Sequence, residues 1–466
     1  MKQLIQRIGF LLAILVVNMT AFAYSFEAGG IYYRILSDSD TERTCEVTFG
    51  DFKYEGNIVI PSSVIYDHHA FSVIGIGESA FDACESLYSV TIPESVTYIG
   101  YSAFRWCTSL TSIIIPDSVM EIGKDAFGVC SSLESITLPD GLTSIESLTF
   151  YECSKLKTLI IPNSVEDIKD GAFTYCELLK SLTIPNSVQK IGDSVFYGCS
   201  SLEDIKLSEE LKTIGYETFK GCSALKRIDL PSSVTTIGND AFRECIALES
   251  VNLPNSITDI GECTFFGCTS LKSISIPDFV SKIGRSAFFE CKSLISVDLP
   301  RSLTEIGNYA FSGCISLVNV ELPTSVNTIG NYSFEACSSL SSVSIQNAVN
   351  EIGWYAFSNC GNLTSVYYNS EDPNNYYNAG IFDGSLDQAI LYVPVSAVFK
   401  CGELIPWRYF KTIVAYDFSG VEAVSGDEAK TVTARYDMSG APVDRDYKGM
   451  VIERYSDGST KKTLQN

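Results

Sequence analysis

Residues 87–109 read LYSVTIPESVTYIGYSAFRWCTS, and this 23-residue unit recurs along most of the 466-residue chain. Thirteen cysteines mark the copies, each 23 positions from the next: Cys84, Cys107, Cys130, Cys153, Cys176, Cys199, Cys222, Cys245, Cys268, Cys291, Cys314, Cys337 and Cys360. No residue is inserted or lost between the first copy and the last. A constant period of this length predicts a repeat solenoid, in which each coil packs only on its neighbours.

The first part of each unit has the pattern of a short strand. Leu87, Val90 and Ile92 are spaced to point into a core, while Ser89 lies between them on the outer side. Pro93 has no N–H to donate to a ladder, so it is expected to end the strand. Stacked copies of this segment predict short parallel strands running across the solenoid.

The second part of each unit turns the chain back toward the next copy. Gly100 suits a tight corner, and Phe104 and Cys107 stand three residues apart, which suits one helical turn. Glu146 and Lys169 replace the glycine in two adjacent copies, so we expect a looser corner there. The predicted fold is therefore an array of thirteen 23-residue turns with short parallel strands and helical turns.

The cysteines of the repeat are expected to be buried, reduced thiols. They hold one place in thirteen equivalent coils, as Phe and Ile do elsewhere in the unit, and a free Cys behaves as a small hydrophobe. Neighbouring coils would bring them within disulfide range, but an odd number of thiols cannot pair completely. Cys45, Cys263 and Cys401 lie outside this series and are expected to be ordinary packing residues.

The N-terminus has the features of a secretory signal peptide. Lys2 and Arg7 precede an apolar run at residues 8–17, and Ala21-Phe22-Ala23 is a small-x-small cleavage site. The alternative, an uncleaved membrane anchor, is disfavoured because ten apolar residues are too few for a span of about 20. The sequence predicts export to the cell surface or the medium, with no membrane span left after cleavage.

The chain divides by composition and pattern into six segments. We expect a signal peptide (1–23), an N-terminal β cap with a partial repeat (24–75), the leucine-rich solenoid (76–368), a C-terminal cap (369–416), a linker (417–430) and a small β tail (431–466). Caps are physically required, because an end coil would otherwise expose its apolar core and open strand edges.

The unit L-x-x-[VI]-x-[IL]-P-x-S-[VL]-x-x-I-G-x-x-A-F-x-x-C resembles the BspA-type leucine-rich repeat over residues 26–416. The resemblance implies an exported or surface protein of the kind found in gut and oral anaerobes, with roles in adhesion, matrix binding and coaggregation. The tail resembles the small β-domains that serve as sorting signals in type IX secretion. The alternative for the tail is a terminal β-module with no address function.

Nothing in the composition favours catalysis. The chain has two histidines, His68 and His69, which are adjacent in a predicted turn and form a poor metal pair. No glycine-rich phosphate loop follows a strand, so we expect no enzyme activity, cofactor or metal. A net charge of −23, or −25 once Lys2 and Arg7 are removed with the signal, disfavours nucleic acid as a partner.

Binding is better supported than chemistry, and the outward strand positions are the first candidates. Most of these positions hold Ser or Thr, but two neighbouring repeats carry charges, and further acidic residues and a Tyr-rich loop follow. The candidate ligand-binding residues are Asp204, Lys206, Arg227, Asp229, Asp298, Glu321, Tyr376 and Tyr377. The four central charges either neutralise one another across strands or form a ligand patch.

Aromatic residues near the Phe-x-x-Cys turn, among them Trp106, Tyr175, Phe266 and Trp354, are further candidates or else edge packing. Two functions remain open. The first is protein–protein interaction or adhesion to host or bacterial surfaces, with a protein ligand. The second is a surface glycan-binding protein serving carbohydrate uptake.

Overall fold

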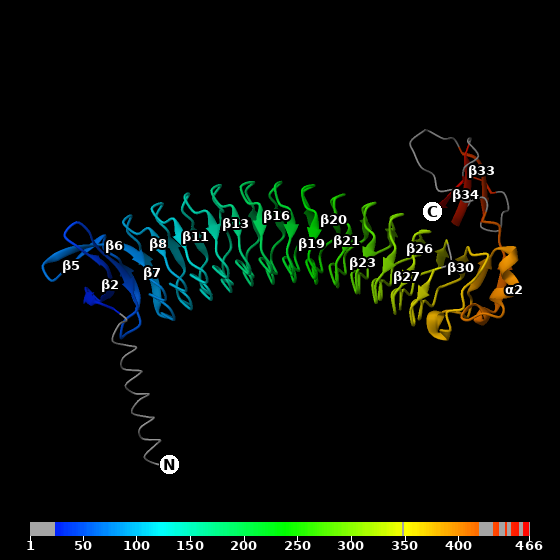
Figure 1. Ribbon diagram of the computed structural model, residues 1–466, viewed down its shortest axis with the longest axis horizontal. Helices are drawn as coiled ribbons and strands as arrows, with labels where there is room; N and C mark the ends of the chain where they lie inside the picture. The colour runs from blue at the N-terminus through cyan, green and yellow to red at the C-terminus, as the bar shows by residue number, and fades with distance from the viewer. Residues whose placement is uncertain are drawn as a thin grey trace, which may run out of the picture.

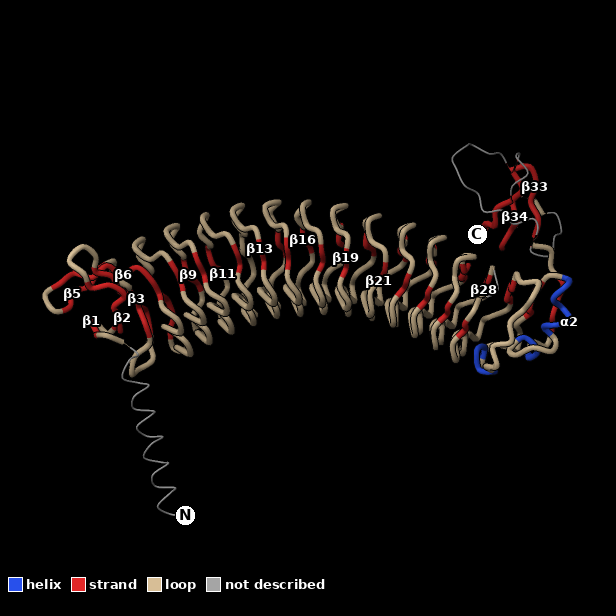
Figure 2. Tube along the Cα trace, in the orientation of Figure 1, coloured by secondary structure: helices blue, strands red, loops and turns tan. Residues whose placement is uncertain are grey.

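The computed structural model describes residues 24–346, 349–418, 432–437, 443–444, 449–455 and 460–465. The repeats stack into a gently curved rod, as Figure 1 shows, and each coil contributes short strands joined by turns (Figure 2). The predicted solenoid of 23-residue turns is confirmed. The signal peptide, the linker 417–430 and parts of the tail fall wholly or mainly outside the described residues.

The first strand of each coil lies on one side of the rod, which we call the long-strand face. Pairing is parallel, and residues 23 apart lie side by side, as Ser181 beside Asp204 and Thr183 beside Lys206. The strands are β4 (Gly56–Val59), β7 (Leu87–Thr91), β9 (Ser112–Ile114), β11 (Ser135–Thr137), β14 (Ser181–Thr183), β16 (Asp204–Lys206), β18 (Arg227–Asp229), β20 (Ser250–Asn252), β22 (Ser273–Ser275), β24 (Ser296–Asp298), β26 (Asn319–Leu322), β28 (Ser342–Ile345), β30 (Ser365–Tyr368), β31 (Ile390–Val393) and β32 (Thr412–Ala415).

A second strand of two residues follows in each coil and forms a separate, short-strand face. Its isoleucines are buried and pair in parallel with the same residue of the next coil, as Ile99 with Ile122. The strands are β8 (Tyr98–Ile99), β10 (Glu121–Ile122), β12 (Ser144–Ile145), β13 (Asp167–Ile168), β15 (Lys190–Ile191), β17 (Thr213–Ile214), β19 (Thr236–Ile237), β21 (Asp259–Ile260), β23 (Lys282–Ile283), β25 (Glu305–Ile306), β27 (Thr328–Ile329) and β29 (Glu351–Ile352).

The predicted helical turn around Ala103-Phe104 is wrong. Residues 101–106 form hydrogen-bonded turns, and Ser102 and Trp106 have left-handed φ angles of 50° and 60°, which a right-handed helix excludes. The N–H groups of Ser102, Phe104 and Trp106 donate instead to carbonyls of the next coil at 3.0, 2.7 and 2.8 Å. The corners therefore form a third line of hydrogen bonds between coils. In a helix the same N–H groups would donate to carbonyls of their own turn.

The glycine corners allow this close stacking. A Cβ on Gly123 would lie 2.7 Å from the backbone of the preceding corner, so a side chain there would force the coils apart. Where Glu146 and Lys169 take the glycine position, their side chains form an ion pair at 2.5 Å. The ring centroids of Phe127 and Phe150, which flank the first replacement, lie 5.9 Å apart, the widest spacing in the phenylalanine stack. The corner hydrogen bonds keep ordinary lengths at this step, as from the N–H of Phe127 to the carbonyl of Thr149 at 2.9 Å, so the looser corner stays a prediction.

Phenylalanine and cysteine fill the interior of each corner. The Phe rings from Phe81 to Phe357 stack with nearly parallel planes and with centroids 4.9–5.9 Å apart. Phe382 of the C-terminal cap extends the column. Each repeat cysteine from Cys107 onward donates its thiol to the carbonyl of the Phe 26 residues earlier, as Cys222 to Phe196 at 3.2 Å. All sixteen cysteines are free thiols. The recurring cysteine is thus a small buried residue that also donates a hydrogen bond to the preceding coil.

The N-terminal cap continues the short-strand face. The strands β1 (Phe26–Ala28), β2 (Ile31–Asp38) and β3 (Arg43–Thr48) are antiparallel, and β3 pairs in parallel with β6 (His69–Ile76), which pairs with β8. β5 (Ser63–Tyr66) closes a hairpin onto β6, with His68 in its exposed turn. Glu46 is buried where the cap meets the coils and accepts a hydrogen bond from Tyr98 at 2.5 Å. The cap thereby shields the first core layer.

The C-terminal cap ends the long-strand face. It contains η1 (Ala379–Phe382), β31, η2 (Val395–Ala397), α2 (Val398–Cys401), η3 (Trp407–Tyr409) and β32. Trp407 is fully buried, stacks on Tyr368 at 4.2 Å and donates from Nε1 to the carbonyl of Asn374 at 3.0 Å. The tail forms a separate antiparallel sheet of β33 (Val432–Asp437), β34 (Gly449–Tyr455) and β35 (Thr460–Gln465).

The buried thiols should resist alkylation in the native protein. Burial raises the pKa of Cys199 to about 12, so at pH 8 its thiolate fraction is on the order of 10⁻⁴. Cys263, the one cysteine that is not buried, should therefore react first with iodoacetamide, and all sixteen should react in guanidinium. Intact-mass measurement counts the adducts, with Cys263→Ser as the control. Rapid native labelling of several cysteines in that variant would contradict the buried ladder.

Replacing a ring of the phenylalanine stack should be costly. Phe219→Ala removes a fully buried ring between Phe196 and Phe242 and should lower the free energy of unfolding by about 3–5 kcal/mol. Tyr216→Ala, three residues away at a half-exposed site, should lower it by less than about 1 kcal/mol. Urea titration followed by circular dichroism compares the two. Equal decreases in the free energy of unfolding would show that the phenylalanine stack does not stabilise the coil.

Candidate functional site

The long-strand face presents three outward side chains in each coil. In the coil of β16 these are Glu203, Asp204 and Lys206, while Leu202 before them and Ile205 among them are buried. Because neighbouring coils are offset by 23 residues, equivalent positions form three columns along the rod. A ligand that lies along this face meets these columns first, since the alternating residues are committed to the core.

Six charges on this face form what we call the charged block: Glu203, Asp204 and Lys206 from the coil of β16, and Lys226, Arg227 and Asp229 from the coil of β18. All six are exposed. Charges of opposite sign stand side by side in every column, yet among the described residues none of the six has an ion pair within 4.0 Å. In the first column, by contrast, Lys157 pairs with Glu134 at 2.8 Å and Lys272 with Glu249 at 2.7 Å.

The structure therefore brings Asp204, Lys206, Arg227 and Asp229 together, as the sequence predicted. It does not show the closed cross-strand pairs that were the alternative explanation for them. Their charged ends face solvent and are available to a partner.

The other predicted residues are not part of this block. Asp298 is exposed four coils from Lys206 in the same column, and Glu321 accepts a hydrogen bond from Gln346 at 3.2 Å. Tyr377 is 81% exposed in the C-terminal cap, whereas Tyr376 packs on Trp407 and donates to the carbonyl of Val349 at 2.6 Å. Burial raises the pKa of the Tyr376 hydroxyl. Tyr376 is thus held by the cap, while Tyr377 is free to make contacts.

An aliphatic stripe on the long-strand face was missed by the sequence analysis. Val59, Ile114 and Ile160 occupy the third column and are 68%, 74% and 84% exposed. Threonines stand between and after them at Thr91, Thr137 and Thr183, so the stripe is β-branched throughout and runs up to Lys206. The signal was present in the sequence as Ile-Ile-Ile-Pro and Leu-Ile-Ile-Pro, where the middle residue must point outward.

The aromatic residues of the corners stack on one another. Tyr309, Tyr332 and Tyr355 form a column with centroids 4.8 and 5.1 Å apart, and Phe266 stacks on Phe289 at 4.8 Å. Arg243 covers the other side of Phe266 at 4.4 Å. Since the faces of stacked rings are covered by neighbouring rings, most of these rings offer only their edges to a ligand. Edge packing between coils, one of the two interpretations of these residues, accounts for the stacked rings, whereas Trp106 and Trp354 are 43% and 57% exposed.

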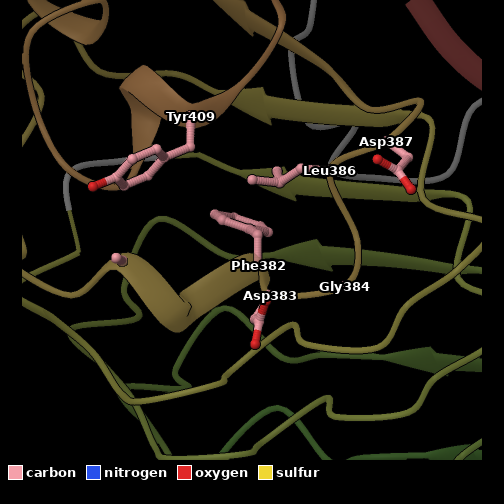
Figure 3. Close-up of a pocket in the computed structure, with 7 residues that line it drawn as sticks. Phe382, Asp383, Gly384, Leu386, Asp387 and Tyr409 are labelled. Atoms are coloured by element: carbon pink, nitrogen blue, oxygen red, sulfur yellow. The ribbon is translucent and has the colours of Figure 1, made fainter.

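A shallow pocket of about 300 Å³ in the C-terminal cap is lined by Phe382, Asp383, Leu386, Asp387 and Tyr409 among others. Figure 3 shows the two carboxylates lying apart from each other. Asp387 interacts instead with Lys411 at 3.4 Å. Within the described residues no three His, Cys, Asp or Glu side chains gather as a metal would require.

Comparison with known protein families identifies the family of the repeat. Residues 74–203, 143–272 and 258–386 match the family described as the BspA type leucine rich repeat region. The chain belongs to this family. No helix in the described part of the chain is long and apolar enough to cross a membrane. The BspA-type repeat accounts for the whole solenoid, and the family generally lacks enzyme activity.

One solved structure supports the assignment, and a second is reported beside it. A leucine-rich repeat protein from Bacteroides ovatus is 31% identical, and the match covers 74% of this chain and 95% of that protein with a TM-score of 0.52. A leucine-rich cell surface protein from Faecalibacterium prausnitzii is 28% identical over 74% of this chain and 94% of that one, with a TM-score of 0.47. A comparison with curated proteins found no match.

Proposed function

We propose that this BspA-type protein is exported and binds another protein through its long-strand face, without enzyme activity. The N-terminal segment supports export, with its basic start, apolar run and cleavage motif. The description of one similar protein as a cell surface protein supports the same location. The partner would be a protein of the host matrix or of another bacterial surface.

The aliphatic stripe is the main support for binding of another protein. Three β-branched side chains, 68–84% exposed, lie in one column of the long-strand face and are separated only by threonine methyls and hydroxyls. Contiguous apolar surface on a soluble protein marks an interaction site more often than single exposed residues do. The charged block adjoins the end of the stripe at Lys206, so the face combines an apolar centre with polar surroundings, as protein interfaces do.

A protein partner fits this face better than a glycan. Sugars bind on open aromatic faces, and the stacked columns at Tyr309, Tyr332 and Phe266 leave few of these. The long-strand face between Val59 and Asp229 offers methyl groups, hydroxyls and charges instead. These groups suit extended contact with another polypeptide.

Charge introduced into the stripe should weaken binding. Ile114→Asp combined with Ile160→Asp should raise the dissociation constant for the protein partner about tenfold or more, since each buries a charge in the interface. Ile295→Asp is a matched control, because Ile295 is 53% exposed on the same face but outside the stripe. Binding of residues 24–466 to immobilised host matrix proteins and to a glycan array provides the measurement.

A loss in the stripe variant alone supports the proposal. Binding to glycans only, or protein binding that the stripe variant leaves unchanged, would refute it.

We also propose that the tail at 431–466 directs the protein to the cell surface. Its three antiparallel strands, β33, β34 and β35, form a compact sheet whose described strands pair only with one another. Deleting 431–466 should therefore retain the protein in the periplasm while leaving the solenoid folded. Fractionation of cells that express each form, with a repeat-specific antibody, measures the effect. Equal amounts of both forms at the surface would refute a sorting role.

A further inference from the structure

The charged block has a property that a patch for an unrelated ligand would not need. The signs of its three columns reverse from one coil to the next, since Glu203, Asp204 and Lys206 of the β16 coil are followed 23 residues later by Lys226, Arg227 and Asp229 of the β18 coil. β16 and β18 are in contact although they belong to separate hydrogen-bonded sheets. The two coils are neighbours in the stack, and the rings of Phe196 and Phe219 place them 5.5 Å apart. The block is therefore antisymmetric about a line that runs between the two coils, parallel to their strands.

An antisymmetric row of charges is complementary to itself. If a second copy faces the first across a twofold axis along that line, the coil of β16 in one copy lies over the coil of β18 in the other. Glu203 then faces Lys226, Asp204 faces Arg227 and Lys206 faces Asp229, and each pair occurs twice. Isologous contacts of this kind are the commonest route to a dimer.

We propose that the charged block is a homodimerisation surface, and that its partner is a second copy of this chain. The other twofold axis that brings the faces together runs along the rod. That arrangement would set Asp204 against Asp204 and Arg227 against Arg227, so the charges select the axis parallel to the strands. All six side chains are exposed and lack an ion pair within 4.0 Å among the described residues, which leaves them available across such an interface.

The flanking coils fit the same axis over a limited distance. One coil further out, Lys180 faces Glu249, again with opposite signs, and the second and third columns set Ser181 against Ser250 and Thr183 against Asn252. These short side chains let two faces approach.

Beyond them, Lys157 faces Lys272, a like pair, although each is already bound to a glutamate of its own chain, Glu134 and Glu249. The complementary region thus spans two coils on each side of the axis. Four coils of about 4.8 Å with strands of about 16 Å give about 310 Å² per copy, which is small for a stable interface. The dimer is therefore weak, salt-sensitive and formed at high local concentration, as on a crowded surface.

The inference is independent of the proposed function. Val59 and Ile114 of the aliphatic stripe lie outside the complementary region, so a dimer leaves part of the stripe free for another protein.

Charge reversal tests the proposal. The first variant carries Asp204→Arg and Lys206→Asp, and the second carries Arg227→Asp and Asp229→Arg. In either homodimer, like charges face each other in two columns, so the dissociation constant should rise at least about tenfold. When the two variants are mixed, the altered residues of one variant face the altered residues of the other with opposite charge, and the second half of the interface keeps the original pairs. A heterodimer should form with an affinity close to that of the unmodified protein.

Sedimentation velocity of residues 24–466 at 20 and 500 mM NaCl measures association. Thermal melts show whether each variant is folded. Heterodimerisation of two variants that do not self-associate, weakened at high salt, supports the proposal, because charges within one chain are repulsive in both variants. A monomer at all concentrations up to millimolar would overturn it, as would self-association that neither variant weakens. Binding to matrix proteins is measured separately, so either proposal can fail alone.

Discussion

Every coil of this protein depends on a corner that gives its backbone N–H groups to the next coil. Two residues in each corner adopt left-handed φ angles, as Ser102 and Trp106 do, and their own N–H groups and that of Phe104 between them point along the rod to the next coil. Such backbone conformations are unfavourable for residues other than glycine. The hydrogen bonds to the following coil and the buried Phe-Cys layer stabilise them. The corner can exist only in a stack, which explains why the repeat is never interrupted.

The cysteine of the repeat contributes to the same constraint. Its thiol fits a fully buried space and donates to a phenylalanine carbonyl in the preceding coil, as Cys176 does to Phe150 at 3.2 Å. Burial raises the pKa of these thiols, so the proton that makes the hydrogen bond is retained at physiological pH. A serine at this place would donate with a shorter reach, and a valine would not donate. Fit and hydrogen bonding together account for the cysteine in the twelve copies from Cys107 onward.

With the interior so constrained, recognition is left to the outward columns. The long-strand face changes character along the rod, from the β-branched stripe to the charged block. Neither feature contributes much to the stability of the coil beneath it, because Val90, Ile113 and Ile205 of the same strands supply the core contacts. One scaffold can therefore vary its partners by changing residues between invariant core positions.

The sequence by itself determined the period, the parallel stacking, the inward residues and the family, because a strict 23-residue repeat permits no other register. It also brought Asp204, Lys206, Arg227 and Asp229 together, since residues 23 apart must be neighbours. The tertiary structure decided the rest. It replaced the expected helical turn with left-handed corners, because hydrogen bonds between coils are invisible to local periodicity. It placed Tyr376 against Trp407 and exposed Ile160, since exposure depends on which sides neighbouring coils cover.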